Sequence, residues 1–202
     1  MRLQHPPAGL EAFGLNSTRK LLPGAGDKTL VAEDHRVLSL PGLDIQAFRS
    51  NHYAGYLSID RQTDSNIFYW LFDAEGGPVG KPLLIWLNGG PGCSSMDGLF
   101  LEVGPFRVNG DQININPHSW HRHANVLFID QPVGTGFSFT KGRNSYPTTY
   151  SEVSEQFYSF LLKFFRLHSR FLTPNDPKRT IPIYISGNSL YVPSMMRSML
   201  FR

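Results

Sequence analysis

Short hydrophobic runs separated by polar turns dominate the chain from Tyr53 onward. Residues 53–59 (YAGYLSI) and 66–72 (NIFYWLF) flank the polar stretch DRQTDS, a pattern that predicts two antiparallel strands. Three further runs are hydrophobic at nearly every position: residues 82–87 (PLLIWL), 125–129 (NVLFI) and 181–185 (IPIYI). Runs without alternation between two faces are typical of buried central strands.

A long helix is predicted between the last two of these runs. Hydrophobic residues recur at helical spacing over residues 150–171, and Thr173-Pro174 ends the pattern. A strand, a long helix and a second strand predict a parallel crossover. The fold class is therefore an α/β sheet with an antiparallel edge. We assign residues 1–52 to a leader and N-terminal extension, and residues 53–202 to the folded domain.

Composition narrows the class of protein. The chain has 202 residues, 41% of them hydrophobic, which suffices for a core. Its net charge is +3 and its basic residues are scattered, so we expect no nucleic acid partner. No apolar stretch reaches the roughly 18 residues that a membrane span needs. The N-terminus has no apolar signal-peptide region, so the sequence assigns no compartment and leaves glycosylation of the Asn16-Ser17-Thr18 triplet open.

Candidate chemistry lies in the loops after the buried runs, because open α/β sheets bind ligands at the carboxyl ends of their strands. Residues 88–95 (NGGPGCSS) contain three glycines, whose backbone N–H groups can point at an anionic oxygen, although an ordinary tight turn has the same composition. Asp130 ends the second run and can accept hydrogen bonds there. Residues 187–189 (GNS) follow the third run and start either a nucleophile elbow or a helix cap.

The sequence holds no recognisable metal site. His118, His121 and His123 do not have the spacing of a zinc site, and no cysteine pair accompanies them. A solvated loop explains them better, and we expect neither a metal nor a cofactor. Cys93 is the single cysteine, so it is either a buried small residue or the partner of a cysteine outside this chain.

Four blocks of sequence carry a resemblance to a known family. They are residues 86–95 (WLNGGPGCSS), 102–106 (EVGPF), 116–120 (NPHSW) and 124–138 (ANVLFIDQPVGTGFS). Together they resemble the serine carboxypeptidases, which include vacuolar, lysosomal and pheromone-processing enzymes. The resemblance runs from about Tyr53 to the end of the chain.

This resemblance implies a fold and an activity. The fold would be that of an α/β-hydrolase, truncated after the nucleophile-bearing strand. The activity would be the release of single residues from the C-terminus of a peptide or protein partner, best at acidic pH. The compartment would be a lysosome, a vacuole or the outside of the cell.

The resemblance also implies roles for individual residues. Ser189 falls on the nucleophile, and the backbone N–H groups of Gly90 and Leu190 fall on the oxyanion donors. The remaining positions would hold the substrate's terminal carboxylate, with Trp86 next to them: Asn88, Gly89, Glu102 and Asn188. Asn188 stands where the family has a glutamate, which would share a proton with the carboxyl group matched by Glu102.

Two departures from the family pattern bear on activity. The family elbow reads Gly-Glu-Ser-Tyr-Ala-Gly, whereas this chain continues from Ser189 directly to Leu190-Tyr191-Val192-Pro193. The triad Asp and His follow the serine in this fold, and residues 190–202 contain neither.

We therefore expect the printed chain to be inactive on its own, and three hypotheses follow. The chain is an active peptidase that receives Asp and His from elsewhere, a non-catalytic remnant that binds peptide C-termini, or the non-functional product of an incomplete gene model.

Overall fold

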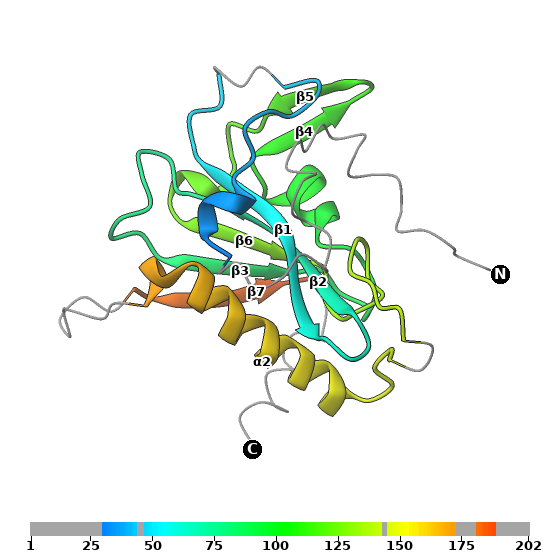
Figure 1. Cartoon of the computed structure of the whole chain (residues 1–202). Coiled ribbons are helices and arrows are strands. Elements are labelled where there is room, and N and C mark those ends of the chain that lie inside the picture. The colour runs from blue at the N-terminus through cyan, green and yellow to red at the C-terminus, as the bar shows by residue number, and fades with distance from the viewer. Residues whose placement is uncertain (1–29, 44–46, 143–144, 173–180, 189–202) are drawn as a thin grey trace.

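The computed structural model describes residues 30–43, 47–142, 145–172 and 181–188. A five-stranded sheet in the order β1-β2-β6-β3-β7 forms its centre (Figure 1). The strands are β1 (His52–Asp60), β2 (Ser65–Phe72), β3 (Leu83–Leu87), β6 (Asn125–Ile129) and β7 (Ile183–Gly187). β3 pairs in parallel with β6 and β7, whereas β2 pairs antiparallel with β1 and β6. The predicted α/β sheet with an antiparallel edge is confirmed.

Strand β7 differs in detail from its prediction. It begins at Ile183 rather than at residue 181 and extends through Gly187. Its side chains are also less buried than a continuous hydrophobic run suggests, since Ile183 and Tyr184 are 44% and 56% exposed. The reason is position, because β7 pairs only with β3 among the described strands.

Helix α2 (Tyr150–Leu167) covers one face of the sheet (Figure 1). It begins at a capping box, in which the Thr149 hydroxyl accepts from the Glu152 N–H and the Glu152 carboxylate accepts from the Thr149 N–H. The helix ends at Leu167, His168 is its C-cap, and the short helix η4 (Ser169–Phe171) follows. The buried side chains of α2 pack against the core beneath it: Val153, Phe157, Phe160 and Phe164.

The opposite face of the sheet is covered by short elements. They are η2 (Gly98–Glu102), η3 (Trp120–Arg122) and the hairpin β4 (Phe106–Asn109) with β5 (Gln112–Ile115). They do not include η1 (Ala32–His35), whose His35 contacts Tyr69 in the core beneath α2. Val37, Leu40 and Phe48 are buried in the core on this face. Part of the predicted N-terminal extension thus packs on the sheet, and the boundary at residue 52 stays a prediction.

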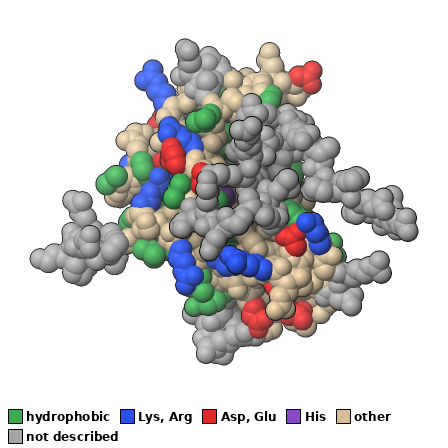
Figure 2. Space-filling model, viewed as in Figure 1, with side chains coloured by type: hydrophobic (Ala, Val, Ile, Leu, Met, Phe, Trp, Pro, Cys, Tyr) green, Lys and Arg blue, Asp and Glu red, His purple; other side chains and the backbone are tan. Residues whose placement is uncertain are grey.

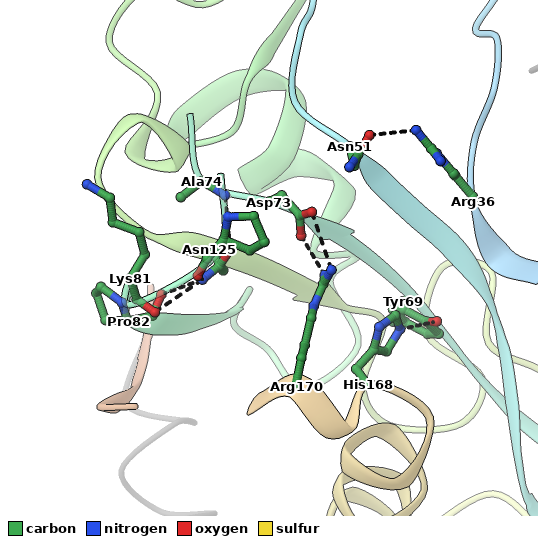
Figure 3. Close-up of polar contacts among 11 residues, drawn as sticks. Arg36, Asn51, Tyr69, Asp73, Ala74, Lys81, Pro82, Asn125, His168 and Arg170 are labelled. Atoms are coloured by element: carbon green, nitrogen blue, oxygen red, sulfur yellow. Dashed lines mark hydrogen bonds and ion pairs between the residues drawn. The ribbon is translucent and has the colours of Figure 1, made fainter. Parts of the chain in front are cut away.

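An ion pair holds η4, which directly follows α2, to the sheet (Figure 3). Asp73 follows β2 and is 2% exposed. The Arg170 guanidinium lies 2.5 Å from its carboxylate and stacks 5.0 Å above the Tyr53 ring. Burial raises the pKa of Asp73, and the charge and hydrogen bonds of Arg170 oppose that rise.

The charged surface is mixed. On the face drawn in Figure 2, Lys and Arg side chains are interspersed with acidic and hydrophobic ones. Within the described ranges, no helix combines the length and hydrophobicity needed to cross a membrane.

Candidate functional site

The carboxyl ends of β3 and β7 bring two asparagines together. Leu87 pairs with Gly187 in the parallel register, so Asn88 and Asn188 leave the sheet as neighbours. The Gly89 N–H donates to Asn188 Oδ1 at 2.9 Å. We call the four residues Asn88, Gly89, Glu102 and Asn188 the amide–acid cluster.

Glu102 lies opposite both asparagines, at the end of η2. Asn188 Nδ2 lies 3.0 Å from Glu102 Oε1 and 3.3 Å from Oε2. Asn88 Nδ2 lies 3.3 Å from Oε1. Asn88 is 6% exposed, whereas Glu102 and Asn188 are exposed. The cluster is thus open to solvent on one side and anchored in the protein on the other.

The Trp86 side chain holds the Asn88 side chain in place through a hydrogen bond. Its indole Nε1–H donates to Asn88 Oδ1 at 2.6 Å. The Trp86 ring is buried and meets the Trp120 ring edge-on, with centroids 5.5 Å apart. Gly98 allows η2 to approach this closely, because a Cβ there would lie 2.1 Å from Trp86 Nε1. The contact between η2 and the indole places Glu102 near the asparagines.

Asp130 holds the glycine-rich loop from the neighbouring strand. Its Oδ1 accepts from the Ser94 hydroxyl at 2.7 Å and the Ser95 N–H at 2.9 Å, and its Oδ2 accepts from the Phe137 N–H at 2.8 Å. Burial raises the pKa of Asp130 to about 6, and these three hydrogen bonds oppose the rise. Asp130 thus joins the loop after β3 to the loop after β6.

Ser95 makes a second connection, which sequence reasoning did not identify. Its hydroxyl accepts from the Asn88 N–H at 3.1 Å and donates to the Ile129 carbonyl at 2.6 Å. The start of the loop is therefore fixed to the end of β6. The sequence did hold a signal for this connection. Two serines follow the glycines in the loop after β3, and Asp130 follows the neighbouring strand β6.

The predicted catalytic residues are described only in part. Gly90 is exposed and has a φ of 120°, and a Cβ there would lie 2.8 Å from the Gly92 nitrogen, so this turn requires glycine. Ser189 and Leu190 lie outside the described residues. Cys93 is exposed and free, so the alternative of a buried small residue is wrong.

The three clustered histidines do not gather. His121 is buried, and its Nδ1 lies 2.8 Å from the Ser119 hydroxyl, whereas His118 and His123 are exposed. In the part of the chain that the structure describes, no three His, Cys, Asp or Glu side chains come together as a metal site would require.

A cavity of about 800 Å³ lies at the other end of the sheet from the amide–acid cluster. Phe48, Asn51, Asp73 and His121 are among its lining residues. Asp73 directly follows Phe72, which pairs with Val126 near the start of β6, whereas the cluster follows the carboxyl ends of the parallel strands. The cavity is therefore separate from the candidate site.

Comparisons with known proteins agree on one family. The model of the serine carboxypeptidase family matches residues 41–201. A serine carboxypeptidase S10 family member of Dictyostelium discoideum is 43% identical over 173 residues, which are 80% of this chain and 29% of that protein. A pheromone-processing carboxypeptidase KEX1 of Phytophthora infestans is 41% identical over 192 residues, which are 94% of this chain and 31% of that protein.

A solved structure gives the same result. The prohormone-processing carboxypeptidase Kex1 of Saccharomyces cerevisiae is 35% identical to the chain, with a TM-score of 0.70. The match covers 86% of this chain and 40% of that one. The chain therefore spans about a third of the length of its curated relatives and less than half of the solved one.

Proposed function

Because the chain belongs to the serine carboxypeptidase family, we propose that it carries the part of a serine-type carboxypeptidase that receives the C-terminal residue of a peptide. The observation that carries the proposal is the amide–acid cluster. Its hydrogen-bonding groups come from three segments and meet at the carboxyl ends of parallel strands, where α/β sheets bind ligands.

The roles of the site residues follow from this position. Asn88, Gly89, Glu102 and Asn188 hold the terminal group of the peptide, and Trp86 keeps Asn88 in place. In this arrangement the scissile carbonyl, which belongs to the residue before the C-terminal one, lies toward Gly90. The backbone N–H groups of Gly90 and Leu190 then stabilise the oxyanion that forms when the serine oxygen attacks.

The nucleophile in this proposal is Ser189. A serine hydroxyl attacks a carbonyl carbon only when a general base takes its proton. Residues 190–202 provide neither His nor Asp. We propose that the 202-residue chain binds peptide C-termini without cleaving them, and that hydrolysis requires a general base supplied from elsewhere.

Peptide binding by the purified 202-residue chain tests the proposal. An N-acetylated tripeptide should bind in isothermal titration, and the head-to-tail cyclic peptide of the same sequence, which has no C-terminus, should not. Asn88→Ala should weaken binding by roughly tenfold, since a hydrogen bond from a buried group is lost. Glu75→Gln, an exposed change near the cavity at the other end of the sheet, should leave binding unchanged.

Hydrolysis is measured in the same samples. We expect no cleavage of a chromogenic blocked dipeptide between about pH 4 and pH 8, a range that titrates carboxyl groups and histidines. Labelling of Ser189 by a fluorophosphonate at the rate of an active serine hydrolase would contradict the absence of turnover. Equal binding of the linear and cyclic peptides would contradict recognition of the C-terminus.

A further inference from the structure

The hydrogen bonds of the amide–acid cluster fix the orientation of both asparagine side chains. An indole N–H and a backbone N–H can only donate. Trp86 Nε1 lies 2.6 Å from Asn88 Oδ1, and the Gly89 nitrogen lies 2.9 Å from Asn188 Oδ1. Each amide oxygen is therefore held by a donor, and each amide nitrogen is left to face Glu102.

Glu102 consequently acts as an acceptor in this arrangement. Its two carboxylate oxygens receive three contacts from amide nitrogens, at 3.0, 3.3 and 3.3 Å. A carboxylate has about four lone-pair positions, and an amide nitrogen has two hydrogens. Glu102 Oε2 accepts only one of these contacts and so can accept another. Asn88 Nδ2 makes only one of them and so can donate a second hydrogen. A ligand that completes the cluster must offer both a donor and an acceptor.

The Glu102 side chain forms no ion pair within the described residues. The nearby Arg107 guanidinium donates instead to the backbone carbonyls of Phe100, Glu102 and Phe106. A second carboxylate that enters the cluster would meet an acidic group that is not ion-paired within the described residues.

We propose that the amide–acid cluster prefers a peptide that ends in a neutral carboxamide over one that ends in a free carboxylate. The inference rests on the proposed function and specifies its ligand. A carboxamide presents an N–H₂ donor and a carbonyl acceptor side by side, so it can donate to Glu102 Oε2 and accept from Asn88 Nδ2. A carboxylate offers only acceptors and brings a like charge to Glu102.

Asn188 is the residue that sets this preference. A second acid at position 188 could share a proton with Glu102 and so donate to a carboxylate. An asparagine has no proton to share. Instead, its amide nitrogen donates to the Glu102 carboxylate and its amide oxygen accepts from the Gly89 N–H, so Glu102 remains a hydrogen-bond acceptor.

Two peptides that differ in one group test the proposal. The purified chain is titrated at about pH 7.5 with an N-acetylated tripeptide that ends either in a carboxamide or in a carboxylate. The carboxamide should bind roughly tenfold more tightly, the effect of one hydrogen bond to a charged group. In Glu102→Gln, the amide can donate to a carboxylate, so the ratio should fall to within roughly twofold.

The matched control is Glu75→Gln, which also removes one exposed negative charge but lies outside the cluster; it should keep the wild-type ratio. Tighter or equal binding of the carboxylate by the wild-type chain would overturn the proposed preference and leave the proposed function standing. So would a ratio that Glu102→Gln does not change. Binding of neither peptide would overturn the proposed function itself.

Discussion

At the scale of single residues, the sequence indicated which side chains meet but not how they are oriented. Asn88 and Glu102 were identified through their sequence blocks, and the structure brings them within 3.3 Å. The direction of the Asn88 amide depends on the Trp86 indole, and the indole is placed by packing against η2 and Trp120. Such long-range packing leaves no local pattern in the sequence.

Asp130 allows a prediction at this scale. In Asp130→Asn, the amide nitrogen must face either the Phe137 N–H or the two donors from Ser94 and Ser95, so at least one buried donor loses its acceptor. We expect a loss of about 1–3 kcal/mol in the free energy of unfolding, measured by urea denaturation. Ser94→Ala removes the hydrogen bond to Asp130 and the one from the Met96 N–H, and should cost about 1–2 kcal/mol. An Asp130→Asn variant as stable as the wild type would contradict the role of Asp130 in holding the loops.

At the scale of elements, hydrophobic runs predicted the five main strands and the long helix. How deeply a strand is buried depends on the elements that pack against it and not only on its hydrophobic residues, as the exposed Ile183 and Tyr184 of β7 show. The hairpin β4–β5 was not predicted, although Asn109-Gly110 is a turn signal, because its strands have four residues each and are mostly exposed. Short exposed strands leave little hydrophobic pattern to detect.

The ion pair between Arg170 and Asp73 gives the prediction for elements, because it holds η4, which directly follows α2, to the end of β2 (Figure 3). Arg170→Met leaves the Asp73 carboxylate buried without its cation. We expect a loss of about 1–3 kcal/mol in the free energy of unfolding, at the low end because the Arg170 side chain is 32% exposed.

A double variant separates the ion pair from the packing of Arg170 on Tyr53. Adding Asp73→Asn to Arg170→Met removes the unpaired buried charge, so part of the lost stability should return. Urea denaturation of the two single variants and the double variant measures the coupling between them. A double variant whose loss equals the sum of the two single losses would show that the charges do not interact.

At the scale of the whole molecule, the buried histidines connect distant parts of the chain. The Tyr69 hydroxyl lies 2.7 Å from His35 Nδ1 and 2.9 Å from His168 Nε2, so one hydrogen-bonded chain joins η1, β2 and the end of α2. His52, at the start of β1, is buried on the opposite face of the sheet, where it stacks on Trp70 and Phe72. Trp70 Nε1 donates to its Nδ1 at 3.0 Å. The His52 nitrogen that accepts from Trp70 carries no proton, and the Tyr69 hydroxyl can donate to only one of its two histidine partners. Burial favours the neutral form of all three rings.

The pH dependence of stability follows from these groups. Burial lowers the pKa of His35 and His52 to about 4 and that of His168 to about 3, from 6.5. The unfolded chain therefore binds more protons at these sites as pH falls below about 6.5, and stability is lost. Asp130 acts in the opposite direction, because its raised pKa lets the folded state hold a proton between about pH 4 and pH 6.

The lowered pKa values of four histidines, with His121 as the fourth, outweigh the raised pKa values of Asp73 and Asp130. The folded chain should therefore lose stability on acidification from about pH 6.5 to pH 4.5. The expected slope is roughly 1–2 kcal/mol per pH unit in the free energy of unfolding, measured by urea denaturation at several pH values. His168→Gln removes one of these buried rings and should flatten the slope by about 1 kcal/mol per pH unit. His118→Gln, a change at an exposed histidine, should keep the wild-type slope. Stability that stays constant or rises toward pH 4.5 would contradict neutral buried histidines, and with them the hydrogen-bonded chain through Tyr69.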